Sequence, residues 1–443
     1  MTLRLLLIRH GLSSFNCENR IQGRNDLSTL TQEGFLQARH VGKVLKEIEF
    51  DNVYSSPLQR AADTTKEILK GRKEVSSIIF DDDLMEVDLG EWSGLTKEEV
   101  QSLYPEQYLA WEKDPNELVL RKSDGKTYKP IKELFNQSEK FLQNLLRKHD
   151  PREENTLLIV GHNAILRCLI MNLLNKPNNG IKRIKLANAS ISIINIKPSE
   201  SSQYNVQIES LNSISHLDNS FPCKGENSRI ILVRHGETNW NREGRFQGQI
   251  DIPLNENGKS QALAAAKILS KLSFSKAFSS SMARPLETAK IILKESQNTQ
   301  IHLEQDLVEI SHGEWEGKLE SEIKGNWGEL LETWQKAPHE AQMPKGENIN
   351  DVWARATSCW GRIRSSLDLN ETVLIVAHDA VNKTILCYLL GLSPKDIWMI
   401  KQGNGGITVI DLSTKGNQPD VVTSMNITSH LGGVLDRTAQ GAL

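Results

Sequence analysis

Residues 230–236 read Ile-Ile-Leu-Val-Arg-His-Gly, and residues 5–11 read Leu-Leu-Leu-Ile-Arg-His-Gly. In both places a short apolar run ends in the tripeptide Arg-His-Gly. A run that is apolar on consecutive residues is typical of a strand in a parallel sheet, because both faces of such a sheet are covered. The tripeptide therefore marks the carboxyl end of a buried strand, and it does so twice.

The repetition continues along the chain in the same order. His10 and Arg60 are 50 residues apart, and His235 and Arg284 are 49 apart. The period is longer than that of solenoid repeats, so each copy is predicted to be a whole domain. The further matched positions are Gln22 with Gln247, Ser55-Ser56 with Ser279-Ser280, Glu86 with Glu309, and His162 with His378.

Apolar runs that alternate with longer amphipathic stretches predict an α/β fold in each copy. We expect two tandem three-layer α/β/α domains with mostly parallel central sheets. The predicted domains are residues 1–218 and 229–443, joined by a polar linker at 219–228. The predicted strands are 2–8, 156–160, 229–233 and 372–376, and the predicted helices are 32–46, 60–70, 257–271 and 284–294.

The composition excludes several classes of partner. The formal net charge is −3 and is spread along the chain without a basic block, so nucleic acid is not expected as a partner. The apolar runs are too short to span a membrane. The first strand begins almost at Met1, which leaves no room for a signal peptide. Five cysteines without a Cys-x-x-Cys pair predict reduced thiols and a cytoplasmic protein.

The repeated residues describe a phosphate site. In open α/β sheets, ligands bind beyond the carboxyl ends of the strands, where all four repeated histidines are expected. Arg60 and Arg284 open predicted helices, where backbone N–H groups favour an anion, and guanidinium groups match phosphate oxygens. A neutral histidine can attack phosphorus without a metal, and Glu86 or Glu309 can protonate the leaving oxygen. No metal-ligand spacing is present in the sequence, so we expect no metal and no cofactor.

Residues 232–241, Leu-Val-Arg-His-Gly-Glu-Thr-Asn-Trp-Asn, and 245–248, Arg-Phe-Gln-Gly, resemble the signature of the histidine phosphatase superfamily, in its phosphoglycerate mutase-like branch. The resemblance implies a phosphoglycerate mutase-like fold and a phosphohistidine intermediate on His235, with Glu309 as the proton donor. It also implies that Arg234, Arg284 and His378 bind the phosphoryl group, and that Asn241 and Gln247 line the pocket. The matching residues of the first copy are Arg9, His10, Asn16, Gln22, Arg60, Glu86 and His162.

These expectations favour a phosphoric monoester hydrolase that acts on a small phosphorylated metabolite. The tandem arrangement resembles cyanobacterial and plant 2-carboxyarabinitol-1-phosphatase-like proteins. One alternative is a cofactor-dependent phosphoglycerate mutase, but residues 310–317 lack the arginine-rich insertion that such mutases carry. Another is a phosphatase whose first copy is regulatory and not catalytic. The sequence alone does not choose the metabolite or the oligomeric state.

The copies differ in three places, which leads us to expect most of the activity in the second. Leu12 stands where the second copy has Glu237, and Asn163 stands where it has Asp379. The Gly-Glu pair at 346–347 has no clear counterpart in the first copy.

Other repeated residues are predicted to be structural: Trp92 and Trp315 as packing residues, and His216 and His430 as caps. For Arg20 and Arg245, the sequence allows either a structural role or a place at the edge of the pocket.

Overall fold

The structure, a computed structural model, describes residues 1–72, 77–122, 124–176, 180–199, 204–217, 221–296, 299–414 and 418–438. The chain divides into two compact units, Met1–Ser220 and Phe221–Leu443. The predicted domain limits and the linker at 219–228 stay a prediction, because residues 218–220 lie outside the described part of the chain.

The first unit is built on a sheet in the order β8-β7-β1-β6-β2-β3. The central pairs β1 with β6, β6 with β2 and β2 with β3 are parallel, whereas β7 runs antiparallel to β1 and to β8. The bounds are β1 (Leu3–Arg9), β2 (Asn52–Ser55), β3 (Ile78–Phe80), β6 (Asn155–Gly161), β7 (Ile191–Lys197) and β8 (Asn205–Ser213).

The second unit repeats this topology in the order β14-β13-β9-β12-β10-β11. Here β9, β12, β10 and β11 are parallel neighbours, and β13 is antiparallel to β9 and to β14. The prediction of mostly parallel central sheets is confirmed in both units. The bounds are β9 (Arg229–Arg234), β10 (Lys276–Ser280), β11 (Ile301–Glu304), β12 (Thr372–Ala377), β13 (Ile407–Asp411) and β14 (Val421–Ile427).

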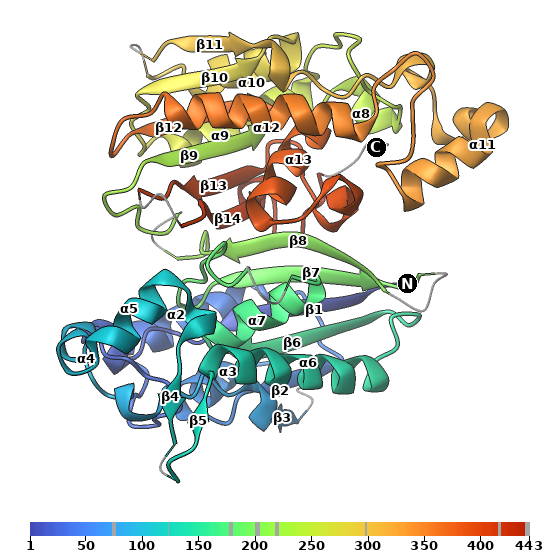
Figure 1. The fold of residues 1–443 in the computed structure, drawn as a ribbon. Helices are drawn as coiled ribbons and strands as arrows, with labels where there is room; N and C mark the ends of the chain where they lie inside the picture. The colour runs from blue at the N-terminus through green and yellow to red at the C-terminus, as the bar shows by residue number, and fades with distance from the viewer. Residues whose placement is uncertain are drawn as a thin grey trace. The chain divides into compact units, whose positions relative to one another are not determined.

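Helices cover both faces of each sheet, which gives the predicted three layers. In Figure 1, α12 and α13 lie in front of the second sheet, and α9 and α10 lie behind it. The first unit has the same pairs, α2 with α3 and α6 with α7. The bounds are α2 (Gln32–Val44), α3 (Gln59–Leu69), α6 (Pro130–Lys148), α7 (Asn163–Leu173), α9 (Glu256–Leu269), α10 (Ala283–Ile292), α12 (Ile349–Ser365) and α13 (Asp379–Leu390).

The strand register brings the repeated histidines together. Arg234 at the end of β9 pairs with Ala377 at the end of β12, and the His235 N–H donates to the Ala377 carbonyl at 3.0 Å. The strand itself is apolar and fully buried, since Ile230, Ile231, Leu232 and Val233 have no exposed surface. The two parallel strands therefore end side by side, and each ends in a histidine.

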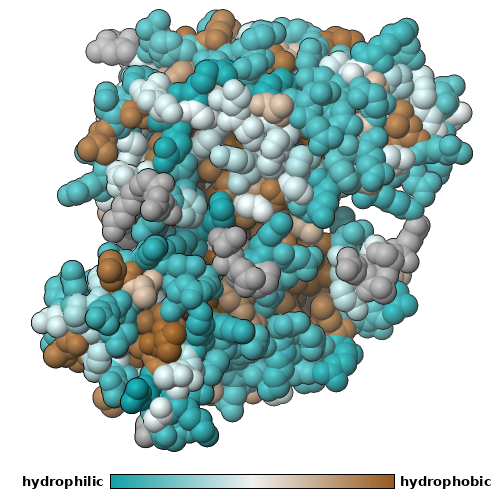
Figure 2. Space-filling view, viewed as in Figure 1, coloured by the Kyte–Doolittle hydropathy of each residue, from teal (hydrophilic) through white to brown (hydrophobic). Residues whose placement is uncertain are grey.

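Each unit has further elements outside these layers. The first unit has α1 (Ser14–Cys17), α4 (Lys97–Leu103), α5 (Pro105–Lys113) and the hairpin of β4 (Leu120–Arg121) and β5 (Thr127–Tyr128), and the second has α8 (Asn239–Glu243) and α11 (Glu320–Lys336). Leu103 and Leu109 of α4 and α5 are exposed, and hydrophobic side chains are visible over these helices in Figure 2. Among the described residues, no helix is both long enough and apolar enough to cross a membrane.

Candidate active sites

His235 lies just beyond the end of β9 and is almost fully buried. Its Nδ1 donates to the carbonyl oxygen of Gly236 at 2.7 Å. Because a carbonyl can only accept, the proton of the neutral ring is on Nδ1, and Nε2 carries the lone pair. Arg284 Nε donates to this Nε2 at 3.3 Å. Burial and the charges of Arg284 and Arg234 lower the pKa of His235 well below its ordinary value, so the ring is neutral at neutral pH.

His378 lies beside this ring, and the two ring centroids are 5.1 Å apart. It is the N-cap residue of α13, and its Nε2 is 2.9 Å from the hydroxyl oxygen of Ser280. Its Nδ1 is buried and has no hydrogen-bond partner among the described residues. This nitrogen is therefore available to an anion that binds between the two rings.

Two buried guanidinium groups border the same position. Arg234 Nη1 donates to the Gln402 carbonyl at 2.6 Å, and Arg284 Nη2 donates to the Gly248 carbonyl at 2.8 Å. Carbonyl groups thus fix both side chains, although Arg234 Nε has no partner among the described residues. Arg284 stands in the first turn of α10, where the helix dipole also favours an anion. Fixed, buried cations of this kind suit a phosphoryl group.

Glu309 is buried and close to the start of α13. Its Oε1 accepts the N–H of Ile310 at 3.0 Å, and its Oε2 accepts the N–H of Asp379 at 3.0 Å. Burial and the neighbouring carboxylate of Asp379 raise the pKa of Glu309 above its ordinary value. A buried carboxyl group with a raised pKa is suited to hold a proton and release it to a leaving group.

Asn241 and Gln247 are tied to the loop that follows His235. Asn241 Oδ1 accepts the N–H of Thr238 at 3.1 Å, and Gln247 Oε1 accepts the Thr238 hydroxyl at 2.8 Å. Asn404 Nδ2 donates both to Asn241 Oδ1 and to the His235 carbonyl, each at 3.2 Å. Gln247 Nε2 is buried without a partner in the described part of the chain, so it can donate to a ligand.

The first unit repeats this arrangement closely. His10 Nδ1 donates to the Gly11 carbonyl at 2.7 Å, and the His10 and His162 ring centroids are again 5.1 Å apart. Burial and the charges of Arg9 and Arg60 lower the pKa of His10 well below its ordinary value. The other matching contacts are Arg9 to the Leu186 carbonyl (2.6 Å), Arg60 to the Gly23 carbonyl (2.9 Å), His162 to Ser56 (2.8 Å), and Asn16 and Gln22 to the Ser13 hydroxyl (2.8 and 3.2 Å).

The glutamate of the first site is held by more N–H groups. Glu86 accepts the N–H of Val87 at 2.9 Å and, at the start of α7, those of Ala164 and Ile165 at 3.1 Å. Glu309 accepts one such bond from the start of α13. All the residues predicted for each site therefore surround the paired histidines, but the two glutamates differ in their hydrogen bonds.

In the second unit an arginine on α12 holds the loop that carries the glutamate. Arg355 donates to the carbonyl groups of Val308 at 2.6 Å and Glu309 at 3.1 Å, and its guanidinium is paired with Glu347 at 2.9 Å. Gln249 Nε2 donates to the same Glu309 carbonyl at 3.0 Å. The Gly-Glu pair noted in the sequence thus acts through Arg355.

In the first unit, an arginine and a glutamine also hold the loop that carries the glutamate, but they have exchanged places. Arg24, at the position of Gln249, donates to the Glu86 carbonyl at 3.1 Å. Gln137 of α6 donates to the Met85 carbonyl at 2.9 Å, and its Oε1 accepts Arg24 Nη2 at 2.6 Å. The arginine comes from the loop and the glutamine from the helix, so the first copy places its glutamate without a Gly-Glu pair.

Leu12 also has a structural explanation. Glu237 Oε1 accepts Asn255 Nδ2 at 2.8 Å, and Asn255 is the N-cap residue of α9. In the first copy Thr31 caps α2, and its hydroxyl donates to the Leu12 carbonyl at 3.1 Å. The change from Glu237 to Leu12 therefore accompanies a change of helix cap and leaves the repeated histidines, arginines and glutamate in place.

Several polar residues that hold the sites were given no role from the sequence. Ser280 contacts His378, and Thr288 accepts the N–H of Gly236 at 3.1 Å. The repeat already paired Ser56 with Ser280, and the same comparison extended to every polar residue also pairs Thr64 with Thr288. The full pairs are Ser56 with Ser280, Ser13 with Thr238, Thr64 with Thr288, and Asn188 with Asn404.

The repeated histidines near the unit ends have the predicted structural role. His216 Nε2 contacts the Ala189 carbonyl at 3.0 Å, and His430 Nε2 contacts the Gly405 carbonyl at 3.1 Å. For Arg20 and Arg245, the contacts favour the structural alternative. Each donates at 2.8 Å to the carbonyl of a glycine, at 94 and 317 respectively.

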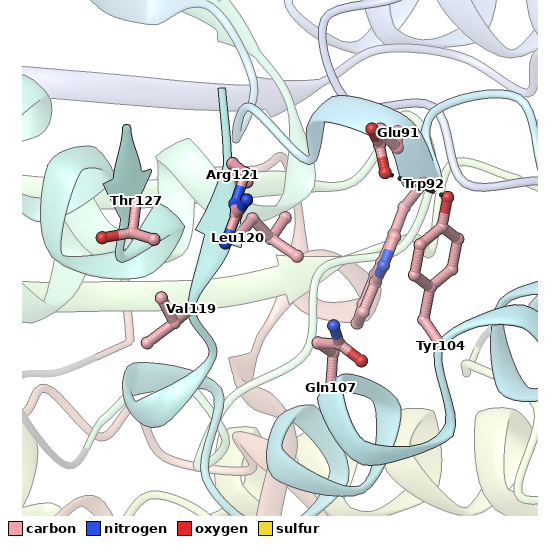
Figure 3. Close-up of a pocket in the computed structure, with 8 residues that line it drawn as sticks. All are labelled: Glu91, Trp92, Tyr104, Gln107, Val119, Leu120, Arg121 and Thr127. Atoms are coloured by element: carbon pink, nitrogen blue, oxygen red, sulfur yellow. Dashed lines mark hydrogen bonds between the residues drawn. The ribbon is translucent and has the colours of Figure 1, made fainter. Parts of the chain in front are cut away.

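Trp92 is buried as predicted and borders a cavity of about 270 Å³ in the first unit (Figure 3). Its ring packs against those of Tyr104 and Trp111, with centroids 6.5 and 6.2 Å away. The Tyr104 hydroxyl donates to Glu91 at 3.1 Å. The cavity belongs to the segment between Glu86 and His162. Its other lining residues are Gln107, Val119, Leu120, Arg121 and Thr127.

The three-layer α/β/α fold, with two histidines, two arginines and a glutamate at the end of a parallel sheet, is accompanied by a family match and by phosphatase-named relatives, which together show a phosphoric monoester hydrolase. The chain belongs to the histidine phosphatase superfamily (branch 1). The family model matches residues 5–207 and again residues 230–425, so each unit holds one match.

Relatives match either the whole chain or one unit. A 2-carboxy-D-arabinitol-1-phosphatase from Triticum aestivum is 28% identical over 97% of this chain and 86% of its own length. Phosphoserine phosphatase 1 from Hydrogenobacter thermophilus is 33% identical over 46% of this chain and 94% of its own length. Among solved structures, Bacillus stearothermophilus YhfR is 31% identical and covers 46% of this chain and 99% of its own, with a TM-score of 0.44.

Proposed function

We propose that each copy hydrolyses phosphomonoesters through a phosphohistidine intermediate, without a metal, on His235 in the second site and His10 in the first. The observation that carries the proposal is the state of the His235 ring. Its Nδ1 proton is committed to the Gly236 carbonyl, which leaves the Nε2 lone pair beside Arg284 and close to the His378 ring. A neutral, oriented imidazole of this kind is a nucleophile.

The surrounding groups take the remaining roles. Arg234, Arg284 and His378 bind the phosphoryl oxygens and stabilise the charge that spreads over them in the transition state. Asn241 and Gln247 keep the nucleophile loop in place, and Gln247 Nε2 donates to an oxygen. In the first site, Arg9, Arg60 and His162 bind the phosphoryl oxygens, and Asn16 and Gln22 keep the nucleophile loop in place.

The reaction has two steps. In the first, His235 Nε2 attacks phosphorus, the bond from phosphorus to the leaving oxygen breaks, and Glu309 gives that oxygen its proton. In the second, the Glu309 carboxylate takes a proton from water, which attacks the phosphohistidine and releases inorganic phosphate. Glu86 takes this part beside His10.

The substrate is proposed to be a small phosphorylated metabolite. The relatives that match nearly the whole chain are named for 2-carboxy-D-arabinitol 1-phosphate, and two of the relatives that match about half of it are named for phosphoserine. These two compounds are the first to test. We also propose a cytoplasmic location, which is supported by five cysteines that are unpaired in the structure.

Chemical trapping tests the mechanism. We expect hydrolysis to persist in excess chelator and to be inhibited by vanadate, which mimics pentacoordinate phosphorus. Brief mixing with a ³²P-labelled substrate should give a label that survives base and is lost in acid, because a phosphoramidate is acid-labile. Label that survives acid, or activity that needs added magnesium, would contradict the proposal.

Three variants test the ranking of the sites. We expect His10→Ala to keep most of the rate on the best substrate, His235→Ala to lose most of it, and the double variant to be inactive. The reason is that the second copy carries the complete signature. Circular dichroism checks that each variant is folded. If His10→Ala is the more damaging change, the ranking is reversed.

A further inference from the structure

The residue that follows His378 in the second site differs in charge from the residue that follows His162 in the first. In the second site this residue is Asp379, which is almost fully buried. Its Oδ2 lies 2.8 Å from Lys383 Nζ, and its Oδ1 lies 3.5 Å from Arg234 Nη1. In the first site the residue is Asn163, which carries no charge.

Asp379 is also a direct neighbour of Glu309. Its backbone N–H donates to Glu309 Oε2 at 3.0 Å, and both residues are buried. The Asp379 carboxylate and burial raise the pKa of Glu309, against the opposing charges of Arg284 and Arg234. Two neighbouring carboxyl groups with little solvent do not both ionise readily, and Asp379 is the one that makes direct ion pairs, with Lys383 and Arg234. The proton is therefore kept on Glu309.

The first site lacks this arrangement. Arg9, Arg60, Arg167 and Cys168 are charged or titratable neighbours of Glu86, and the position of Asp379 is taken by the uncharged Asn163. Glu86 also accepts three backbone N–H groups, which stabilise a carboxylate and not a carboxylic acid. Glu309 accepts two such groups, so the hydrogen bonds favour a carboxylate more strongly at the first site than at the second.

We propose that Asp379 is a positioning residue that keeps the proton on Glu309, so that the second site cleaves alkyl phosphates whereas the first prefers aryl phosphates. An alkoxide is a poor leaving group and must receive a proton as the bond to phosphorus breaks. A nitrophenolate leaves without one. The inference rests on the proposed function and adds to it a division of substrates between the two copies.

The test isolates each site and compares two leaving groups. His10→Ala leaves only the second nucleophile, and His235→Ala leaves only the first. For each protein we would measure kcat and KM with p-nitrophenyl phosphate and with glycerol 3-phosphate. The ratio of the alkyl to the aryl rate should be at least tenfold higher in His10→Ala than in His235→Ala.

Exchange of the charged residue gives the decisive comparison. In the His10→Ala background, Asp379→Asn should lower the alkyl-to-aryl ratio of kcat roughly tenfold. It should also move the alkaline limb of the kcat profile on the alkyl substrate to lower pH, because Glu309 then loses its proton more easily. Asn163→Asp in the His235→Ala background should raise the ratio. Glu256→Gln, which removes an exposed carboxylate from the second unit, is the matched control and should leave the ratio unchanged.

Two outcomes would overturn the inference. Equal losses on both substrates in Asp379→Asn would mean that this residue acts through Arg234 and phosphate binding. An unchanged ratio and pH profile in a folded variant would mean that Asp379 has no influence on Glu309. If both esters are hydrolysed and their ratio of rates does not differ between the two sites, the inference fails but the phosphohistidine mechanism stands. If neither ester is hydrolysed and no base-stable label forms, the proposed function itself is refuted.

Discussion

At the scale of single residues, the candidate sites depend on which ring nitrogen is free. The carbonyl of the glycine after each Arg-His fixes the proton on Nδ1 of His10 and His235. The chain makes this contact within one residue of the histidine, so it needs no distant partner. Burial and the positive charges of the neighbouring arginines lower the pKa of both rings, which keeps them neutral.

The role of Glu309 gives a prediction at this scale. We expect Glu309→Gln to lower kcat on an alkyl phosphate by about 10²–10⁴-fold, with a smaller change in KM, because proton transfer matters mainly in the transition state. Steady-state kinetics in the His10→Ala background measure this effect. Glu314→Gln, five residues along the chain and partly exposed, is the matched control. Unchanged turnover in Glu309→Gln would assign proton transfer to another group.

At the scale of elements, the nucleophile loop packs closely against α2 in the first unit and against α9 in the second. A Cβ atom at Gly258 of α9 would lie 2.1 Å from the Glu237 carbonyl oxygen, and one at Gly236 would lie 2.3 Å from the Gly258 carbonyl oxygen. Gly11 and Gly34 make the same approach in the first unit. The loop can reach its position only because neither residue has a side chain.

This contact predicts the effect of one methyl group. Gly258→Ala should destabilise the protein by about 1–3 kcal/mol, since backbone must shift to make room. Gly361→Ala on α12 is the control, because its Cβ would meet no atom within 4 Å and alanine favours helix. Urea denaturation monitored by circular dichroism compares the two. Equal midpoints for both variants would show that the loop is not confined by α9.

The exchanged arginine and glutamine give a second prediction at this scale. We expect Arg355→Gln to lower kcat of the second site roughly tenfold, because the loop that carries Glu309 loses its anchor on α12. Addition of Gln249→Arg should recover part of that loss by recreating the arrangement of Arg24 and Gln137. Arg362→Gln, on the exposed side of the same helix, is the control. If the double variant is worse than Arg355→Gln, the two units do not hold their glutamates in equivalent ways.

At the scale of the whole molecule, buried histidines link stability to pH. Burial lowers the pKa of His312 to about 3 and those of His216 and His430 to about 4, and the four site histidines shift in the same direction. In the unfolded chain these groups titrate near pH 6.5. The unfolded state therefore binds more protons below pH 6.5. Stability is fully present above that pH and is lost as the pH falls toward the folded values.

Denaturation at several pH values checks this prediction. The urea midpoint should fall steadily between pH 7 and pH 4. His312→Leu should lose less stability over this interval than the natural chain, because one buried titrating group is removed. A midpoint that does not depend on pH in this range would contradict the assignment of neutral buried rings.

The sequence by itself determined the duplication, the parallel sheets and the residues that surround the paired histidines. These are local features, because an apolar strand ending in Arg-His-Gly and an arginine opening a helix are each encoded within a few residues. Parallel strands must end at one edge, so the residues that follow them had to meet. The domain limits and the catalytic roles stay predictions.

Only the tertiary structure decided what modifies the sites. Asp379 and Glu309 are 70 residues apart in the chain, yet the Asp379 N–H donates to Glu309 Oε2 at 3.0 Å. Arg355, which lies on another helix, donates to the backbone carbonyl of the same glutamate. In one copy the helix supplies the arginine and the loop the glutamine, and in the other copy the two are exchanged. No local pattern predicts which arrangement is used, because either one satisfies the same carbonyl groups. Contacts of this kind depend on the packing of helices across the sheet, and it is there that the two copies differ.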